Sequence, residues 1–297
     1  MREPIGHDRA KALLARLRPQ ALLLTGPEGV GRRTLARWFA YGLNCERGFP
    51  PCGACRSCRL DPHPDHLEIA PQTGERQRPV IPVERIVPRE GGGANLLEWI
   101  EAAPRFRRKV AVIDGAERLT EAAANALLKT LEEPPGHAHL VLVAGSRDAV
   151  LPTLASRSLE VRLSPLPEAE LRAIRDDPDL LAFAEGAPGR LFWAIEHPEE
   201  VRALVRLVDD LLLGLDDGTA SAERLKELLS RAQSGLPPWP FLRRAFAKLP
   251  PDARTEALGF LVKLEEALAA FVAPDLLAAW GVHELRRIYG TLRPRAL

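Results

Sequence analysis

The chain has 297 residues, of which 46% are apolar and 27% charged, close to the usage of ordinary globular domains. This composition excludes a disordered chain, a collagen-like repeat and a coiled-coil rod, and the length favours two or three domains. The 41 basic and 40 acidic residues leave a net charge of +1, which excludes nucleic-acid binding by an overall basic surface. No apolar run approaches the roughly 20 residues of a membrane span, and the start lacks the apolar core of a signal peptide. We therefore expect a cytoplasmic protein without a membrane partner.

Short apolar strands alternate with helical patterns in the first half, which is typical of a parallel sheet built from βαβ units. We expect buried strands over 21–25, 109–114 and 139–145. The helix after the first strand has apolar residues at helical spacing, which predicts one buried face made of Leu35, Trp38, Phe39 and Leu43. The first half is therefore predicted to be an α/β domain.

The helix expected after the second strand has Thr120 as its N-cap and Pro134 and Pro135 as its stop. Farther along, strand patterns fade and amphipathic helices dominate. Clusters of Gly and Pro divide the chain into an α/β domain over 1–165, a small helical domain over 166–205 and a helical bundle over 206–297.

A glycine-rich turn follows the first strand. Gly26 and Gly31 have the spacing G-x-x-x-x-G of a phosphate-binding loop, with Gly29 between them, and the turn joins a strand to a helix. A working loop continues with a Lys that reaches the phosphates and a Ser or Thr that ligates magnesium. Here Arg32 and Arg33 hold these positions, and arginine offers no oxygen to a metal. The loop is therefore predicted to be degenerate, kept as scaffold or for nucleotide binding by backbone N–H groups without turnover.

The second predicted strand ends in Asp114, the position of a metal-orienting aspartate, but Gly115 follows it. ATPases of this architecture usually place a glutamate at that next position to polarise the attacking water. Glu117 lies three residues beyond Asp114, and it is expected to point elsewhere if a turn or helix begins. Two defects in separate motifs predict that the chain alone is not an enzyme and does not hydrolyse ATP.

Four cysteines lie within fourteen residues. Cys45, Cys52, Cys55 and Cys58 form C-x6-C-x2-C-x2-C, a spacing that can close a tetrahedral zinc site without other ligands. A four-thiolate site leaves no position for water, so its Zn²⁺ is structural. We expect this metal to hold together a small module at about 44–62.

Other interpretations of the cysteines stay open. A ferredoxin-type iron–sulfur run is disfavoured, because it places its fourth Cys after the triplet with a Pro behind it. The remaining alternatives are four buried or redox-active thiols, and a site in which His63 or His66 replaces one Cys.

Taken together, these segments resemble the δ′ subunits of the bacterial DNA polymerase III clamp loader, a family of the AAA+ superfamily. The resemblance is carried, in this order, by GPEGVGRR, CGACRSC, DGAERLTEAAANALLKTLEEPP and LASRS. They cover most of residues 20–160, and the long third segment is the most specific because coincidence over its length is improbable. Residues 73–93 do not follow the family pattern, so nothing is carried over to them.

The resemblance implies a RecA-like AAA+ parallel-sheet domain with an inserted zinc module, a helical lid and an all-α C-terminal collar domain. It implies a hetero-oligomeric ring with γ/τ and δ subunits, acting on the sliding clamp and primed DNA. In such loaders, the Arg of a Ser-Arg-Cys motif reaches the ATP of the neighbouring subunit. The motif is Ser156, Arg157 and Ser158 here, so Arg157 is implied as an arginine finger supplied in trans.

Arg190, in GAPGRLFW, occupies the place of the lid arginine that senses nucleotide in this family. With a degenerate loop, the alternative role for Arg190 is packing or ion pairing. Like Asp114, it is an uncertain member of the nucleotide site.

The favoured function is a non-hydrolysing clamp-loader subunit that helps sister ATPases open the sliding clamp and place it on primed DNA. The alternative is an active motor ATPase of the γ/τ type, in which Arg32 stands in for the lysine. A free-standing zinc module that binds nucleic acid is disfavoured by the neutral net charge and the lack of interleaved aromatic residues.

Overall fold

The computed structural model describes residues 3–72, 79–88, 95–270 and 272–290. The chain forms two compact units: the first comprises 1–167 with 187–189, and the second comprises 168–186 with 190–297. Of the segment 73–93, residues 73–78 and 89–93 lie outside the described part of the chain.

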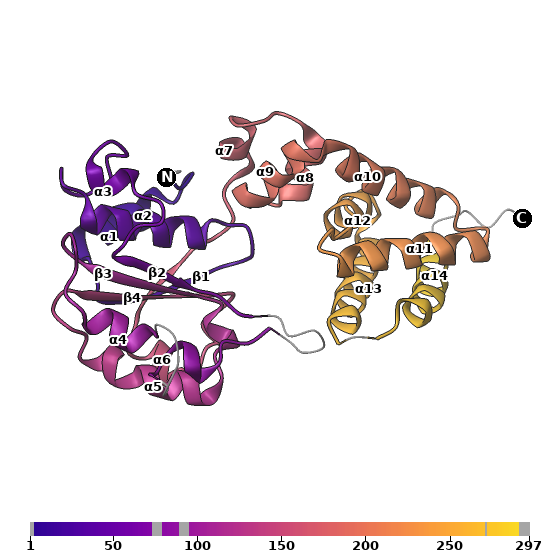
Figure 1. Ribbon diagram of the computed structural model, residues 1–297. Helices are drawn as coiled ribbons and strands as arrows, with labels where there is room; N and C mark the ends of the chain where they lie inside the picture. Colours follow the sequence, from indigo (N-terminus) through magenta and orange to yellow (C-terminus); the bar gives the residue numbers. More distant parts are fainter. Residues whose placement is uncertain (1–2, 73–78, 89–94, 271, 291–297) are drawn as a thin grey trace, which may run out of the picture. The chain divides into compact units, whose positions relative to one another are not determined.

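The first unit is built on a parallel sheet of five strands in the order β2-β3-β4-β1-β5 (Figure 1). Strands β1 (Ala21–Thr25), β3 (Lys109–Asp114) and β4 (Ala138–Ala144) lie where the sequence predicts strands. The sequence analysis misses β2 (His66–Ile69) and β5 (Leu159–Arg162). Each has only four residues, half of them charged or imidazole side chains, so its apolar pattern is too short to recognise.

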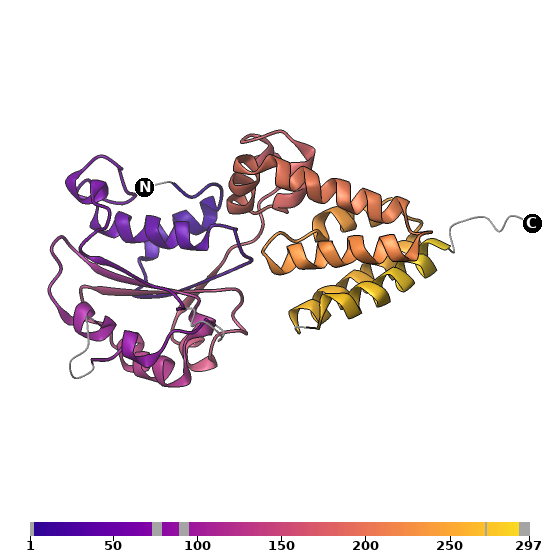
Figure 2. The same cartoon turned by 45° about the vertical axis from the view of Figure 1, so that its right-hand side comes forward.

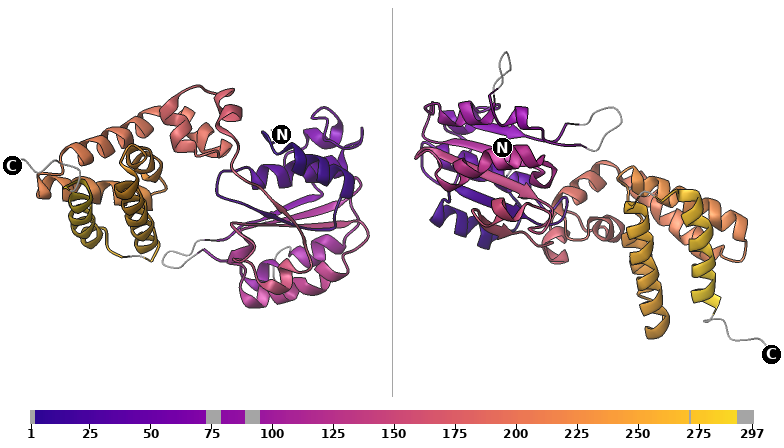
Figure 3. Two further views of the ribbon diagram at one scale, coloured as in Figure 1. Left: turned by 180° about the vertical axis from the view of Figure 1, so that it is seen from behind. Right: turned by 90° about the horizontal axis from the view of Figure 1, so that it is seen from below.

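Successive residues of each strand face opposite sides of the sheet. Leu22 and Leu24 of β1 pack on the side of α1 (Asp8–Leu17) and α2 (Arg32–Asn44). Leu23 packs on the other side, which is covered by α4 (Leu96–Glu101), α5 (Glu121–Glu132) and α6 (Pro152–Ala155). Figure 2 and the left view of Figure 3 show both helical layers. The unit is therefore a three-layer α/β/α domain, and the sheet is buried on both faces.

The predicted helical details of the first unit are confirmed. All four residues of the expected face of α2, Leu35, Trp38, Phe39 and Leu43, are buried. Thr120 is the N-cap of α5, and its hydroxyl oxygen accepts a hydrogen bond of 3.3 Å from the N–H of Ala123. The short helix α3 (Arg56–Arg59) and the 3-10 turns η1 (Val83–Arg85) and η2 (Ala116–Arg118) lie in the connections.

The described part of the second unit is helical. Its helices are α7 (Glu168–Arg172), α8 (Pro178–Ala184), α9 (Pro188–Glu196, whose first two residues belong to the first unit), α10 (Pro198–Leu213), α11 (Gly218–Gln233), α12 (Trp239–Phe246), α13 (Pro251–Ala269) and α14 (Pro274–Gly290). The side chain of Leu225 in α11 packs against Gly281 of α14, where a Cβ would lie 2.6 Å from Cδ2 of Leu225. The predicted domain boundary at 205 falls inside α10, so the separation of lid from collar stays a prediction.

No helix in the described ranges is both long enough and apolar enough to cross a membrane.

Candidate functional site

The glycine-rich loop connects β1 to α2, and its three glycines all have positive φ angles. Gly26, Gly29 and Gly31 have φ values of 146°, 76° and 108°. At Gly26, a Cβ would lie 2.3 Å from the carbonyl oxygen of Leu163, so no larger residue fits without a shift of the backbone. The glycines are therefore required by the fold of the loop and by its packing against the residue that follows β5.

Two distant residues hold the carbonyl groups of this loop. His7 Nε2 lies 2.9 Å from the carbonyl oxygen of Val30, and the N–H of Gly189 donates to the carbonyl oxygen of Gly29 over 2.8 Å. A Cβ on Gly189 would lie 3.0 Å from that same oxygen. The sequence analysis misses both contacts, since neither residue belongs to a local pattern. The protein's own groups thus fix the loop in its folded form.

Arg33 lies between two carboxylates at the edge of the sheet. Its Nη2 is 2.5 Å from Oε2 of Glu68 in β2, and its Nη1 is 3.9 Å from Oδ2 of Asp114 at the end of β3. Glu68 also accepts a hydrogen bond from Nε of Arg37, one turn farther along α2. The guanidinium of Arg33 is thus paired with carboxylates of the two neighbouring strands.

These contacts affect the two carboxylates differently. Burial acts to raise the pKa of Glu68, but the hydrogen bonds from Arg37 and Arg33 outweigh it and place the pKa below its ordinary value. Burial also raises the pKa of Asp114, and here the charges of Arg33 and Arg32 only partly oppose it. Glu68, which the sequence analysis misses because β2 is not recognised, is therefore the stronger partner of the loop arginine.

Glu117 lies closer to this edge than the sequence analysis expects. Gly115, with φ of 83°, turns the chain after β3 into η2, which carries Glu117. A Cβ on Gly145, at the end of β4, would lie 3.9 Å from Oε1 of Glu117 and 4.0 Å from Nη1 of Arg32. Oε2 of Glu117 is buried without a hydrogen-bond partner among the described residues. Its charge contributes to raising the pKa of Asp114.

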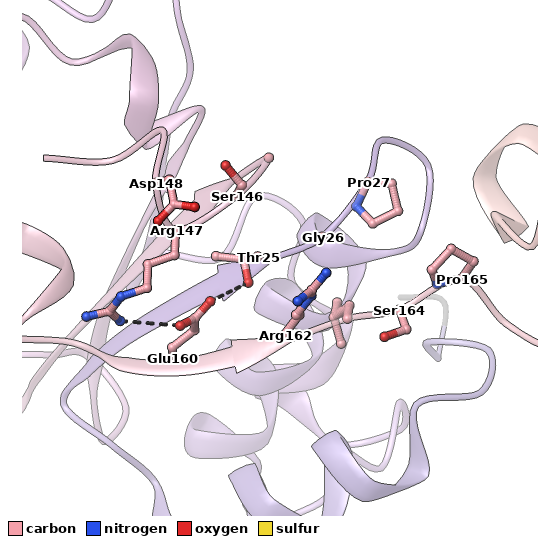
Figure 4. A pocket seen from close by; sticks show the side chains of 12 residues that line it. Thr25, Gly26, Pro27, Ser146, Arg147, Asp148, Glu160, Arg162, Ser164 and Pro165 are labelled. Carbon is pink, nitrogen blue, oxygen red and sulfur yellow. Dashed lines mark hydrogen bonds and ion pairs between the residues drawn. The ribbon is translucent and has the colours of Figure 1, made fainter. Parts of the chain in front are cut away.

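A cavity of about 650 Å³ opens at the carboxyl ends of β1, β4 and β5 (Figure 4). The hydroxyl of Thr25 donates to Glu160 over 2.8 Å, and Nη1 of Arg147 lies 3.3 Å from the other carboxylate oxygen of Glu160. Gly26 and Pro27 of the loop also line the cavity. Open parallel sheets bind ligands at this edge. The sequence analysis misses the cavity, because part of its lining comes from the unrecognised β5.

The four cysteines meet between α2 and β2. Their Sγ atoms all lie within 4.8 Å of one another, and all four thiols are free of disulfide bonds. The N–H of Cys55 donates to Sγ of Cys52 over 3.3 Å, and the N–H of Cys58 donates to Sγ of Cys55 over 3.4 Å. Two backbone N–H groups of this segment therefore point at cysteine sulfur atoms.

Backbone hydrogen bonds lower the pKa of one thiol, whereas burial raises the pKa of another. Backbone N–H groups of Ala54 and Cys55 lower the pKa of Cys52 to about 6, whereas burial raises that of Cys58 to about 12. His63 takes part in a separate hydrogen-bond pair: its Nε2 lies 3.0 Å from Oγ of Ser57, and its Nδ1 accepts from the N–H of Asp65. Among the described residues, the group with metal-binding geometry here contains the four cysteines and neither histidine.

Arg157 follows α6 on the surface of the first unit. Its side chain is 35% exposed, and its Nε lies 2.5 Å from Oε1 of Glu132 at the end of α5. Ser158, at the position that usually holds Cys, donates from its hydroxyl to the carbonyl oxygen of Leu154 over 3.0 Å. An exposed guanidinium on a fixed segment can contact an anion that another molecule presents.

Arg190 belongs to the second unit and has partners there. Its Nη1 lies 3.1 Å from Oε2 of Glu185, and its guanidinium lies 4.9 Å from the ring centroid of Phe183. These are the contacts expected of the pairing alternative. The nucleotide-sensing role of Arg190 stays a prediction.

The parallel sheet and the glycine loop at its carboxyl edge define a three-layer α/β domain, and the cysteine cluster lies in the connection after α2. The chain belongs to the family described as DNA polymerase III, delta subunit, whose model matches residues 10–167. The resemblance indicated by the sequence motifs is thereby confirmed.

Individual relatives agree with this family. Over 184 residues, the chain is 36% identical to DNA polymerase III subunit delta′ of Pseudomonas aeruginosa, covering 57% of this chain and 53% of that protein. Over 155 residues, it is 35% identical to DNA polymerase III subunit tau of Escherichia coli, covering 51% of this chain and 23% of that protein. The chain thus spans about half the length of the delta′ relative.

Among solved structures, a DNA polymerase III gamma subunit-related protein from Thermotoga maritima is 20% identical. The match covers 94% of this chain and 98% of that one, with a TM-score of 0.49.

Proposed function

We propose that the chain is a non-hydrolysing subunit of the replicative clamp loader. In this proposal it joins γ/τ and δ subunits in a cytoplasmic ring, and it helps its sister ATPases open the sliding clamp and load it on primed DNA. The family match over 10–167 and the identity to delta′ and tau subunits support this assignment.

The observation that carries the non-hydrolysing role is the position of Arg33. A hydrolysing loop offers a hydroxyl to magnesium at this point, and a nearby aspartate orients the metal. Here a guanidinium lies 2.5 Å from Glu68 and 3.9 Å from Asp114. A fixed positive charge between these carboxylates repels a divalent cation and supplies no ligand to it. Magnesium-dependent turnover by this chain is therefore not expected.

In the same proposal, Arg157 is an arginine finger supplied to the ATP of a neighbouring subunit. Its support is its place in the SRS motif, its partial exposure and its anchored segment. A guanidinium that reaches the transferring phosphoryl group stabilises its charge, and such fingers are worth about 10³ to 10⁵ in rate. The chain thus contributes to hydrolysis without hydrolysing ATP itself.

We also propose that Cys45, Cys52, Cys55 and Cys58 hold a structural Zn²⁺. A tetrahedral zinc site with Zn–S bonds of about 2.3 Å separates its sulfur atoms by roughly 3.8 Å. Sulfur atoms that all lie within 4.8 Å of one another fit this geometry after small adjustments. The metal would link the end of α2 to α3, a segment with little other core of its own.

The deciding experiment is a calorimetric titration of magnesium ATP into the purified chain, with phosphate release followed on the same sample. The proposal expects no phosphate release. Absent binding would fit a loop kept only as scaffold, and binding without release would fit a nucleotide held by the loop's backbone N–H groups. Binding with turnover would overturn the non-hydrolysing role.

The second candidate is a motor ATPase of the γ/τ type, which the 35% identity to the tau subunit favours. It requires Arg32 to take the place of the phosphate-binding lysine. Nη1 of Arg32 approaches Gly145 at the carboxyl edge of β4, so its charge lies at the appropriate edge of the sheet. The same titration separates the two candidates, because only the motor releases phosphate.

A further inference from the structure

We propose that Glu132 is a positioning residue for Arg157, which it holds in the orientation needed to reach the ATP of a neighbouring subunit. This inference rests on the proposed role of Arg157 as an arginine finger. It assigns a role to the end of α5, a part of the chain outside the glycine loop, the cavity and the cysteine cluster.

Two of the three guanidinium nitrogens of Arg157 are bound by acceptors of its own chain. Nε lies 2.5 Å from Oε1 of Glu132, and Nη1 donates to the carbonyl oxygen of Thr153 over 3.0 Å and to Oγ of Ser156 over 3.4 Å. Within the part of the chain that the structure describes, Nη2 makes no hydrogen bond. Because the guanidinium is planar, fixing Nε and Nη1 also fixes the direction in which Nη2 points. One donor of the fork therefore stays available to an incoming phosphate.

Glu132 and Arg157 both lie next to buried residues in the chain. Leu131, which precedes Glu132, is 3% exposed, and Leu154 and Ala155, just before the arginine motif, are 0% and 3% exposed. All three belong to one core cluster beneath the sheet. The core thus holds the backbone at the ends of α5 and α6, which keeps Glu132 and Arg157 close enough for their side chains to pair.

Because the ion pair of Arg157 and Glu132 is exposed, we infer that it orients the arginine. It adds little to the stability of the fold, and it does not keep the guanidinium from a phosphate. The side chains of Arg157 and Glu132 are 35% and 50% exposed, and ion pairs in such positions contribute little to folding. A free arginine loses much rotamer freedom when it binds a phosphate, and a weak pair that preselects one rotamer lowers this cost. The same weakness lets the guanidinium move onto a phosphate, which is a bidentate acceptor for arginine.

The chain supplies a matched control next to Glu132. Glu133 carries the same charge at the same helix end, and it is exposed. It is the C-cap of α5, where its backbone N–H donates to the carbonyl oxygen of Lys129. Removing the Glu133 side chain leaves that backbone bond intact. A general effect of charge near the finger would therefore appear in both variants, whereas positioning would appear only at Glu132.

The test is a double-mutant cycle on DNA-stimulated ATP turnover by the loader reconstituted from this chain and its sister subunits. Glu132→Ala should lower kcat about ten- to a hundredfold, the loss typical of a misplaced catalytic group. Glu132→Gln, which keeps an acceptor oxygen, should restore part of the loss, and Glu133→Ala should match the unmodified protein. Arg157→Ala with Glu132→Ala should be no worse than Arg157→Ala alone, since there is then no finger to position.

Other outcomes would overturn the proposal. Unchanged turnover in Glu132→Ala, with turnover lost in Arg157→Ala, would remove the positioning role and leave the finger. Multiplying effects in the double variant would show that Glu132 acts independently, and increased turnover would show that it restrains the finger. Loss of ring assembly with Glu132→Gln but not with Glu133→Ala would assign Glu132 to the interface instead. If Arg157→Ala itself has no effect, the finger assignment fails first.

Discussion

The guanidinium of Arg33 lies 2.5 Å from the carboxylate of Glu68, joining the first turn of α2 to the short edge strand β2. Glu68 also binds Arg37 of the same helix, so one carboxylate holds two arginines of α2. In a hydrolysing relative of this fold, the charges of the bound nucleotide and metal would help to balance the charged side chains around the loop. Here Glu68 and Asp114 provide carboxylates to Arg33, so this arginine has acidic partners within the chain.

Replacing Glu68 with Gln should destabilise the chain modestly. The Glu68 side chain is 17% exposed, but Arg33 is 54% exposed, so solvent screens the pair and the expected loss is about 1 kcal/mol. The pKa of Glu68 is lowered from 4.5 in the folded chain, so this stability is present above that value and is lost as the pH falls through the folded pKa. Urea unfolding at pH 7 should separate the variant from the unmodified chain, and the difference should shrink as the pH is lowered through the folded pKa of Glu68.

A suitable control for that variant is Glu199→Gln, which removes an exposed pair with Arg202. Its unfolding midpoint should stay unchanged within error. Equal losses in both variants would show that Glu68 contributes no more than an ordinary surface charge.

Acid should destabilise the chain through His66. Burial lowers the pKa of His66 from 6.5 to about 4. Between these two pH values, His66 is therefore protonated in the unfolded chain but neutral in the folded chain. Stability is therefore full above the unfolded pKa and falls as the pH is lowered from 6.5 toward 4. The contribution lost between pH 7 and pH 5 is about 2 kcal/mol.

The measurement for His66 is the unfolding free energy of the chain and of His66→Gln at both pH values. The difference between the two proteins isolates His66 from the other acid-sensitive groups, including the cysteine cluster. A variant that loses as much stability as the unmodified chain on acidification would rule out His66 as the cause.

The core of the first unit could be predicted because its elements repeat one physical pattern over many residues. The strands at 21–25 and 109–114 and the buried face of α2 all have uninterrupted apolar spacing. The four cysteines were equally predictable, since ligands so close in sequence must be close in space. The apolar spacing and the cysteine spacing both involve residues that are close together in the sequence, so they can be recognised from the sequence alone.

The contacts that define the loop's chemistry are not local. Glu68 and Glu160 lie on four-residue strands without a clear apolar pattern, and each reaches its partner only through the order of strands in the sheet. His7 and Gly189 meet the loop from distant parts of the chain. Sequence patterns describe which residues belong to one element, but they do not describe which elements become neighbours.

The cysteine cluster should contain about one zinc per chain by elemental analysis after purification without chelators. Removing zinc, or replacing Cys55 with Ser, should lower the melting temperature, because bound metal stabilises only the folded chain. The loss is on the order of 4 kcal/mol when free zinc exceeds its Kd a thousandfold. Arg56→Ala, which alters α3 without removing a ligand, should keep its zinc. Iron in place of zinc, or no metal at all, would refute the assignment.

Arg157→Ala should leave the chain folded and assembled with its sister subunits, yet lower ATP turnover by the reconstituted loader by about 10³-fold or more. The fold should tolerate the change because the side chain is 35% exposed and its ion pair with Glu132 is screened by solvent. The large kinetic effect follows from charge that develops on the transferring phosphoryl group, which only a correctly placed cation stabilises.

The control for this variant is Arg202→Ala, which also removes an exposed, ion-paired arginine. It should turn over ATP like the unmodified protein, since Arg202 lies in α10, outside the SRS motif and its ion pair. Gel filtration of each reconstituted loader establishes assembly before turnover is compared. If Arg157→Ala assembles and hydrolyses ATP at the full rate, this residue is an ordinary surface arginine and the proposed finger role is wrong.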